Sequence, residues 1–541
     1  MNHLSTSDYV VFLIYFIVVS GYGYWVYRSK KNQNIDTKDY FLAQGSLTWW
    51  AIGASIIASN ISSEHFIAMS GSGFAMGLAI SSYEWMAAAT LIIVAVFFLP
   101  IYIKNKIYTM PQFLSTRYDD TVSGVMAIFW LLIYIFVNLT SIFFLGALAI
   151  ETITGISFNV CVFGLAVFSA IITLGGMKVI GYTDVIQVFV LILGGLITCY
   201  KALDLVSVKL GAHTVLGALP ILREQAADHF HMIFHPGDKY YDDLPGVAVL
   251  AGGLWINNLN YWGCNQYIVQ RALGADLKTG RSGLIFAAFL KLLIPVIVVI
   301  PGIAAYVLYQ HGYFHAEMLD NGVLKPDHAY PTLMNLLPSG IKGLAFAALT
   351  AAIVASLAGK SNSIATIFTL DVFKKYVDKN ASEKKLVNVG RITVIVASII
   401  AMTIAPALRT FDQVYQFIQE YVGFISPGIF TIFLLGFFWK RTTSRAALIT
   451  AIATIPLSVI FKYLPKLSGG YFAPIPFLHR MTWVFAIVML LTIVVTLLDP
   501  KSKDNKQALE VDSSMFKVTP GFIIASVTIC GILTALYTVF W

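Results

Sequence analysis

The chain has 541 residues, of which 58% are hydrophobic and only 12% are charged, and its mean hydropathy is +0.76. This composition excludes a soluble globular domain and predicts an all-α polytopic membrane protein, with the lipid bilayer as its surroundings. The net charge of +8 is expected from loops that face the cytoplasm and not from a nucleic-acid partner, and the four cysteines lack the paired spacing of a disulfide framework or a zinc site.

Apolar runs that are long enough to cross a bilayer predict about 14 transmembrane helices in a single transporter domain, 1–541. In chain order they are expected near 8–28, 47–76, 80–103, 122–153, 157–177, 183–203, 246–270, 282–309, 340–373, 388–406, 412–439, 444–463, 478–498 and 518–541. The polar start NHLSTSD precedes the first helix and the basic residues Arg28, Lys30 and Lys31 follow it, which is the reverse of a signal peptide.

If the first helix ends in the cytoplasm, most of the 36 Lys and Arg residues fall in inner loops, with Lys38 and Lys178 among them. An excess of basic residues marks the cytoplasmic side of a membrane protein. We therefore expect a multi-pass protein of the cell membrane with both termini outside.

Helices two to six and seven to eleven form two sets of five, at approximately 47–203 and 246–439, and each set opens with a helix interrupted by polar residues. In the second of these helices the interruption is a cluster of asparagines at mid-span, namely Asn257, Asn258, Asn260 and Asn265. Interrupted helices at matching positions predict an inverted repeat with a binding site at the repeat interface. The remaining helices, which we expect to be peripheral, are 8–28, 444–463, 478–498 and 518–541.

The interrupted helix of the first set carries the polar run Ser59 to His65 inside an apolar segment. Unsatisfied backbone groups and ionisable side chains are costly in hydrocarbon, so this helix is expected to break and to line a polar cavity. The freed carbonyls of Ala58 and Ile61 and the hydroxyl of Ser356 predict a small oxygen cage for a hard cation. Small residues such as Ser356 are also typical of helix packing, which is the competing interpretation.

Other intramembrane polar residues provide mixed hydrogen-bond donors and acceptors, which suit a neutral polyol better than a carboxylate ligand. They are Asn60, Glu64, His65, Glu84, Lys291, Gln419 and Glu420. The rings of Tyr261 and Tyr415 offer faces for a sugar. The alternatives are an ion pair between Glu84 and Lys291, helix packing by Asn258 and Asn260, a core role for His65, and a role in the bundle for Glu420.

Two further features have other interpretations. Lys360 lies toward the inner end of the ninth helix, and we expect its side chain to extend to the membrane interface. The external residues His229, His231 and His235 fit either a metal cluster or a short amphipathic helix. The spans contain no nucleotide-binding loop and no nucleophile paired with a base, so neither ATP-driven transport nor an enzyme is expected.

Several motifs together resemble the sodium/solute symporter family over roughly residues 8–465. They are ASNISSEHFIAMSGSG, SYEWM, GGMKVIGYTDVIQV, WINNLNYWGCNQYIVQRAL, FAAFLKLLIPV and YQFIQEYVGFISPG. Within the family, the chain most resembles bacterial sodium/galactose symporters and animal sodium/glucose cotransporters. The resemblance implies a leucine-transporter-like five-plus-five inverted repeat with broken helices 2 and 7, and sodium-driven alternating access.

The resemblance also implies roles for individual residues. The sugar-binding residues are Asn60, His65, Glu84, Asn258, Lys291 and Gln419, with Tyr261 as the inner gate. The outer gate is implied at Met69, Tyr83 and Tyr415. The sodium site is implied at Ala58, Ile61, Ala352, Ala355 and Ser356, with Asp184 on the exit path of the ion.

Three positions depart from the family pattern. His65 stands where the bacterial members have glutamine, Ala87 replaces a serine of the sugar site, and Ala355 lacks a hydroxyl. Ala352 also lacks the hydroxyl that accompanies a second sodium in some members, so we expect one sodium per sugar. We expect no organic cofactor.

The expected function is therefore sodium-coupled symport of a hexose of the galactose or glucose type. Two alternatives stay open, namely sodium symport of another small polar solute such as inositol or a sugar acid, and a sugar-gated channel or sensor.

Overall fold

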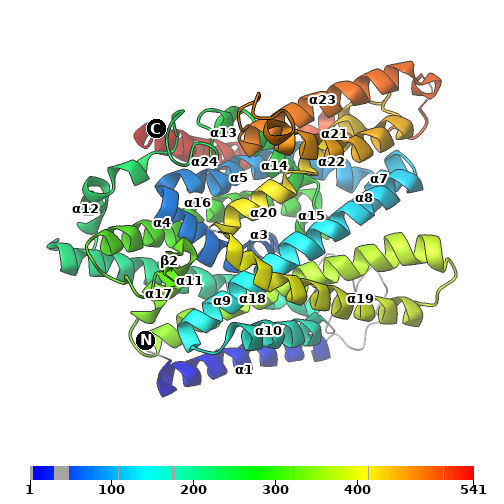
Figure 1. Ribbon diagram of the computed structural model, residues 1–541. Helices are drawn as coiled ribbons and strands as arrows, with labels where there is room; N and C mark the ends of the chain where they lie inside the picture. The colour runs from blue at the N-terminus through cyan, green and yellow to red at the C-terminus, as the bar shows by residue number, and fades with distance from the viewer. Residues whose placement is uncertain are drawn as a thin grey trace.

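Helices form nearly all of the computed structural model, which describes residues 4–29, 48–107, 109–173, 177–320, 322–411, 413–503 and 505–541 (Figure 1). Within these ranges the strands are one antiparallel hairpin, β1 (Leu319–Asp320) and β2 (Val323–Leu324). The basic residues Lys30, Lys31 and Lys38, which contribute to the predicted orientation, lie outside the described residues.

The first half of the chain contains short and long helical elements in succession. They are α1 (Thr6–Ser29), α3 (Trp49–Asn60), η1 (Glu64–Met69), α4 (Ser70–Met76), η2 (Gly77–Ser81), α5 (Ser82–Ile93), η3 (Val94–Phe98), α6 (Leu99–Lys104), α7 (Met110–Arg117), α8 (Asp120–Leu132), η4 (Ile133–Leu139), α9 (Thr140–Thr154), α10 (Phe158–Thr173), α11 (Met177–Leu210), α12 (Ala218–Gln225) and η5 (Ala227–Phe230).

The second half of the chain also consists mainly of short and long helical elements. Its elements are α13 (Ala248–Ala251), α14 (Gly253–Gly263), α15 (Gln266–Leu273), α16 (Leu277–Gln310), η6 (Pro326–His328), α17 (Ala329–Asn335), α18 (Ile341–Thr366), η7 (Ile367–Val377), α19 (Glu383–Ile404), η8 (Ala405–Thr410), α20 (Val414–Val422), α21 (Ser426–Phe438), α22 (Ser444–Leu467), α23 (Phe477–Leu498), η9 (Pro500–Ser502), η10 (Ser513–Phe516) and α24 (Pro520–Val539).

Nine continuous helical runs among the described residues are long and apolar enough to cross a membrane, and α20 with α21, bent by 44°, makes a tenth candidate. The prediction of an all-α polytopic membrane protein is therefore confirmed, but the count of fourteen is not. The pieces α3, α14 and α15 are individually too short to span a bilayer, because the helix breaks after α3 and again between α14 and α15. The predicted helix 183–203 begins earlier, at Met177, so that Asp184 lies inside α11.

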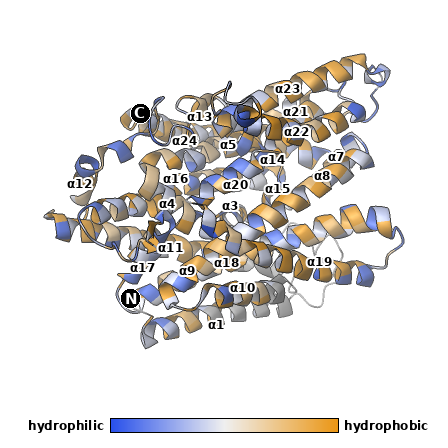
Figure 2. Cartoon of the chain, viewed as in Figure 1, coloured by the Kyte–Doolittle hydropathy of each residue, from blue (hydrophilic) through white to orange (hydrophobic). Residues whose placement is uncertain are grey.

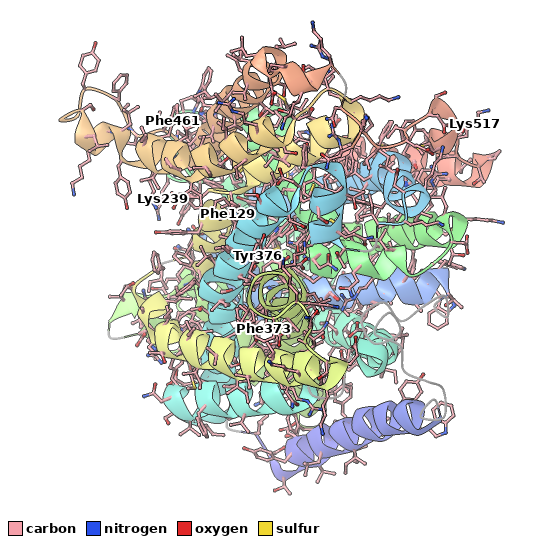
Figure 3. All side chains as sticks on the ribbon, turned by 90° about the vertical axis from the view of Figure 1, so that its right-hand side faces the viewer. Phe129, Lys239, Phe373, Tyr376, Phe461 and Lys517 are labelled. Atoms are coloured by element: carbon pink, nitrogen blue, oxygen red, sulfur yellow. The ribbon has the colours of Figure 1, made fainter. Side chains whose placement is uncertain are left out.

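The run α18–η7 lies in the middle of the bundle. In its most apolar window 89% of the residues are buried, against 6% for α24. Figure 3 shows this run nearly end-on at the centre, where its own residues Phe373 and Tyr376 are labelled, with other helices around it. Hydrophilic colours gather near α3 and α20, whereas α19, α22 and α23 are mostly hydrophobic (Figure 2). The polar residues of the spans are therefore turned inward.

The predicted break in the first interrupted helix is confirmed. Helix α3 ends at Asn60, and the next residue, Ile61, has an extended backbone with φ −74° and ψ 121°. The chain resumes a helix at Glu64, in the π-helical segment η1. The last carbonyls of α3 therefore lack the amides that a continuing helix would supply.

The second interrupted helix is divided twice, at Gly252 and at Cys264–Asn265, so a break is confirmed at Asn265. The other three asparagines of the predicted interruption, Asn257, Asn258 and Asn260, lie inside the unbroken helix α14. A Cβ atom on Gly253 would lie 2.3 Å from the carbonyl oxygen of Leu478, so only glycine allows α14 to pack this closely on α23. At the second division the Asn265 side chain accepts a hydrogen bond from the hydroxyl of Tyr134. The breaks thus have specific polar and packing partners.

Candidate functional site

A small polar cavity of about 60 Å³ lies where the two interrupted helices meet α5, α18 and α20. Its lining comprises Asn60, Glu64, His65, Tyr83, Glu84, Asn138, Asn257, Asn258, Tyr261, Trp262, Tyr267, Lys360, Tyr415, Ile418, Gln419 and Val422. Six of the seven predicted solute-binding residues are in this set, and Lys291 is the exception. Ligand pockets typically have volumes of roughly 300–1,000 Å³, so this cavity must widen to admit a solute.

Lys291 reaches the cavity wall through two residues that do line it. Its side chain is fully buried, its ammonium donates to Glu84 Oε2 at 2.5 Å, and it also donates to Asn60 Oδ1. The Nζ atom lies 4.9 Å from the centre of the Trp262 ring. The structural ion pair considered for Glu84 and Lys291 is therefore present, and it holds the Glu84 carboxylate at the cavity.

Tyr261 lines the cavity and contacts Tyr267 of α15. Its hydroxyl accepts a hydrogen bond from Asn60 Nδ2 at 2.9 Å and another from the hydroxyl of Tyr267. Because Tyr261 accepts a hydrogen bond from Asn60, a predicted solute-binding residue, a movement of the Asn60 side chain changes a contact of the predicted inner gate.

The amide side chains of α14 divide between the cavity and helix packing. Asn257 donates to Gln419 Oε1 at 2.7 Å, and Asn258 donates to the carbonyl of Leu254 at 3.1 Å. Asn260 donates to the Ser426 hydroxyl of α21 at 2.9 Å, which fits the packing role considered for it. Asn258 still lines the cavity, so both of its interpretations remain open.

His65 contributes one ring nitrogen to the charged network. Its Nε2 atom lies 3.4 Å from Glu84 Oε1, while Nδ1 is buried and has no hydrogen-bond partner within the described part of the chain. A fully satisfied core histidine would have partners on both nitrogens. Nδ1 is therefore available to a ligand.

Aromatic rings cover one side of the cavity. Tyr415 makes edge contacts with His65 and Tyr83, at centroid distances of 6.4 Å and 5.3 Å. The Tyr83 hydroxyl donates to Gln416 Oε1 at 3.4 Å, and Met69 is fully buried. The three predicted outer-gate residues, Met69, Tyr83 and Tyr415, thus lie in a packed and closed arrangement.

The predicted ion cage lies at the break of α3. The Ser356 hydroxyl of α18 donates to the carbonyl of Ile61 at 3.4 Å, and Ala58, Ala352 and Ala355 are buried. A hydroxyl and the freed carbonyls are oxygen donors, which hard cations prefer. These residues fit a sodium ion, and the same closeness serves the packing of α3 on α18.

Asp184 has a partner that the sequence did not reveal. Its carboxylate accepts from the Ser55 hydroxyl at 2.7 Å and pairs with Arg271 at 3.5 Å, and Arg271 also donates to Ser55 and to the Tyr267 carbonyl. The signal for Arg271 was a basic residue at the end of an interrupted helix. The group links the predicted exit residue to the segment that carries Tyr267.

The expectation for Lys360 is wrong. Instead of extending to the membrane interface, its side chain is buried in the bundle and pairs with Glu64 at 3.3 Å. The break of α3 places a carboxylate within reach of α18, and this contact between distant segments is not visible in the sequence. Glu420, by contrast, serves the bundle as considered, because it pairs with Arg480 at 2.5 Å and Lys462 at 3.3 Å.

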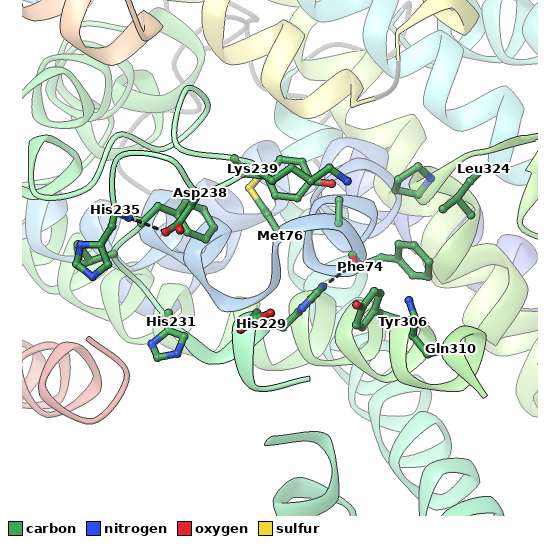
Figure 4. Close-up of a pocket in the computed structure, with 16 residues that line it drawn as sticks. Phe74, Met76, His229, His231, His235, Asp238, Lys239, Tyr306, Gln310 and Leu324 are labelled. Atoms are coloured by element: carbon green, nitrogen blue, oxygen red, sulfur yellow. Dashed lines mark hydrogen bonds between the residues drawn. The ribbon is translucent and has the colours of Figure 1, made fainter. Parts of the chain in front are cut away.

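The external histidines do not converge on a metal site. His229 packs against Tyr306 and hydrogen-bonds to the Phe74 carbonyl, whereas His231 contacts the Trp541 carbonyl, and Figure 4 shows His231 and His235 separated from His229. Among the described residues no group of three or more His, Cys, Asp or Glu side chains has a metal-binding arrangement. Burial lowers the pKa of His229.

A polar pocket of about 430 Å³ lies beside the predicted outer-gate residue Tyr83 and contains Asp243, Gln416 and Glu420. Burial, together with the neighbouring carboxylates Asp242 and Glu420, raises the pKa of Asp243 to about 6. Asp243 therefore titrates near pH 6, and it shares this pocket with Gln416, which accepts a hydrogen bond from Tyr83.

A polytopic helical bundle with a closed polar cavity between two interrupted helices defines a secondary transporter. The model of the sodium:solute symporter family matches residues 40–454, and the chain belongs to this family. Solute movement in the family is coupled to sodium, so the predictions of a sodium-coupled transporter and of a function other than an enzyme are confirmed.

Curated relatives match along most of the chain. A sodium/glucose cotransporter of Vibrio parahaemolyticus is 46% identical over 546 residues, which covers 99% of this chain and 99% of the relative. Sodium/myo-inositol cotransporter 2 of Homo sapiens is 33% identical over 487 residues, covering 84% of this chain and 70% of the relative.

Solved structures show the same fold. A Na+-coupled sialic acid symporter in a substrate-bound outward-open state has a TM-score of 0.75 at 23% identity and covers 92% of this chain and 98% of its own. Mhp1, a nucleobase-cation-symport-1 family transporter in a closed conformation, has a TM-score of 0.54 at 14% identity and covers 88% of this chain and 100% of its own. The expected leucine-transporter-like architecture agrees with these neighbours.

Proposed function

We propose that the protein moves a neutral hexose of the glucose or galactose type into the cell together with one sodium ion, by alternating access. The observation that carries the proposal is the network of Asn60, Lys291, Glu84 and His65 on the wall of the closed cavity. Hydroxyl groups both donate and accept hydrogen bonds, and this network offers an amide, a carboxylate and an imidazole. The sodium/glucose cotransporter from Vibrio supports the same solute class.

The solute site is assigned to Asn60, His65, Glu84, Asn258, Tyr261, Lys291 and Gln419. The ion site is assigned to Ala58, Ile61, Ala352, Ala355 and Ser356, and Asp184 lies on the way out. Sodium binds first and holds the broken end of α3 against α18, which positions Asn60 and His65 for the solute. Outer closure by Met69, Tyr83 and Tyr415 and movement of Tyr261 then release both toward the cytoplasm.

The energetics suffice for accumulation. One charge that crosses a membrane potential of about 100 mV contributes roughly 2.3 kcal/mol, which is about a fifty-fold solute gradient. The chemical gradient of sodium adds to this value.

Uptake into proteoliposomes tests the proposal. Labelled glucose and galactose should accumulate when an inward sodium gradient is imposed, and accumulation should cease when choline replaces sodium. Accumulation that is indifferent to sodium rejects the proposal. Sodium current without accumulation would instead support the sugar-gated channel or sensor.

A second candidate solute is a cyclic polyol, because sodium/myo-inositol cotransporter 2 of Homo sapiens is 33% identical to this chain. Unlabelled glucose, galactose, myo-inositol and a sugar acid should be compared as competitors of labelled glucose. The solute with the lowest half-inhibitory concentration identifies the substrate class.

The domain plan is part of the proposal. We assign the inverted repeats to 47–203 and 246–439, with peripheral helices at 8–28, 444–463, 478–498 and 518–541, and both termini outside the cell membrane. Tags at the two ends should be cleaved by a protease added to intact cells, and protection of either tag refutes this orientation.

A further inference from the structure

The Glu64 carboxylate, at the start of η1, accepts hydrogen bonds from two serine hydroxyls. Its Oε1 atom accepts from the Ser141 hydroxyl at 2.6 Å, and its Oε2 atom accepts from the Ser62 hydroxyl at 3.3 Å. The side chain is buried, and the Ser141 hydroxyl also contacts the Asn138 carbonyl at 2.9 Å. A buried carboxylate with neighbouring hydroxyls and a carbonyl is the ligand chemistry that a hard cation prefers.

A cation already occupies this position, and it is part of the chain. The Lys360 ammonium lies 3.3 Å from Glu64 Oε2, and the residue is only 2% exposed. Its second contact is the ring of Tyr267, at 5.8 Å from Nζ to the centroid. An ammonium group has three donors, and within the described residues Glu64 is its one side-chain acceptor.

The other buried lysine of the cavity is held more firmly. Lys291 donates to both Glu84 and Asn60 and lies 4.9 Å from the centre of the Trp262 ring. Lys360 has one acceptor, at a longer distance, and it faces the cavity. Lys291 therefore organises the solute network, whereas Lys360 serves chiefly to neutralise Glu64.

The Glu64–Lys360 pair is adjacent to the proposed sodium cage. Lys360 follows Ser356 by one helical turn of α18, and Glu64 lies three residues after Ile61, across the break. Both sites therefore join the same two segments. A single chain thus offers two neighbouring positions for positive charge, one open to an ion from solution and one filled by its own side chain.

We propose that Glu64, Ser62 and Ser141 form a second cation site, and that the Lys360 ammonium fills this site in place of a second sodium ion. The inference rests on the proposed sodium symport and deepens it. The tethered charge fixes the stoichiometry at one sodium ion per solute, and it removes the dependence of the second site on the external sodium concentration.

The test is the number of sodium ions bound by the purified full-length protein, measured with sodium-22 in detergent. The parent protein should bind one ion. Lys360→Met removes the tethered charge but keeps a long buried side chain, and it should bind two. Lys360→Arg should bind one, and the double variant Glu64→Gln, Lys360→Met should return to one because it lacks the carboxylate. Lys342→Met, at a buried lysine of the same helix, is the matched control and should bind one.

Thermal midpoints and size-exclusion profiles identify variants that do not fold, and Lys360→Gln is the replacement if Lys360→Met fails. A folded Lys360→Met or Lys360→Gln variant that binds a single ion overturns the inference. Equal binding by Lys360→Met and the double variant also overturns it, because the carboxylate would then have no part. These outcomes are distinct from a failure of the proposed symport, which shows as absence of solute accumulation by the parent protein in proteoliposomes.

Discussion

Replacement of Glu84 by glutamine is the most direct perturbation of the solute site. The Glu84 carboxylate contacts Lys291 at 2.5 Å and His65 at 3.4 Å and lines the cavity. Glu84→Gln keeps the shape of the side chain but removes its charge. A hydrogen bond to a charged group contributes about 1.5–3 kcal/mol, so solute affinity should fall by about tenfold to about 150-fold.

The same substitution leaves the Lys291 ammonium buried without a carboxylate partner, so that its side-chain acceptors, Asn60 among them, are all neutral. Removal of one partner of a buried ion pair is destabilising, by about 3–5 kcal/mol when the charge is left uncompensated. The amide oxygen of glutamine still accepts a hydrogen bond, so the loss should be at the lower end of this range. The thermal midpoint of the variant should therefore fall measurably.

A double-mutant cycle separates the two effects. Glu84→Gln combined with Lys291→Met removes both charges, so it should recover most of the lost stability but not the lost solute affinity. Solute affinity is measured by isothermal titration in saturating sodium, and stability by the thermal midpoint without solute. If folded Glu84→Gln binds solute within twofold of the parent protein, the assignment of the solute site is refuted.

Three further predictions follow from the site and from the outer pocket. Ser356→Ala removes the one side-chain oxygen of the proposed ion cage, so the sodium concentration for half-maximal uptake should rise at least about tenfold, and unchanged sodium dependence would show that Ser356 only packs the helices. Gln419→Ala removes the acceptor of Asn257, and solute binding should be lost while the sodium-induced thermal shift is kept; loss of both would mean a general packing defect. The pKa of Asp243 is raised from 3.8 to about 6, so the folded state binds the proton more tightly than the unfolded state does. The contribution of Asp243 to stability should therefore be greatest below about pH 4 and decrease as the pH rises to about 6. Asp243→Asn should flatten this part of the thermal-midpoint profile, and an unchanged profile would exclude Asp243 as its source.

The sequence was sufficient to predict the breaks of the two interrupted helices. Polar residues such as Ser62 and Asn265 have no stable place in a lipid-facing helix, so their presence inside a span predicts local disruption. The same physical argument brought Asn60, Glu84 and Gln419 to one cavity. The scarcity of polar residues inside the spans thus pointed to residues that line this cavity.

Contacts between distant segments were not predictable. Arg271 pairs with Asp184, and Lys360 pairs with Glu64 across nearly 300 positions of the chain. A lysine near the end of a predicted span can extend to the interface or turn inward. Which of the two occurs depends on whether the folded bundle places a carboxylate within reach of the lysine in its interior. The 44° bend between α20 and α21 was also missed, although Gly423 and Pro427 lie at or beside it.

The hydroxyl of Tyr261 bonds both Asn60 and Tyr267, and the backbone of Tyr267 holds the arginine that pairs with Asp184. A continuous chain of contacts therefore runs from Asn60, in the proposed solute site, to Asp184, on the proposed exit path of the ion. If a solute binds Asn60 as proposed, its release would change the contacts of Tyr261 and Tyr267, and through Tyr267 those of Arg271. The proposed solute site and the proposed exit residue of the ion are therefore joined by one continuous chain of hydrogen bonds and an ion pair, which gives a change at one of them a direct physical route to the other.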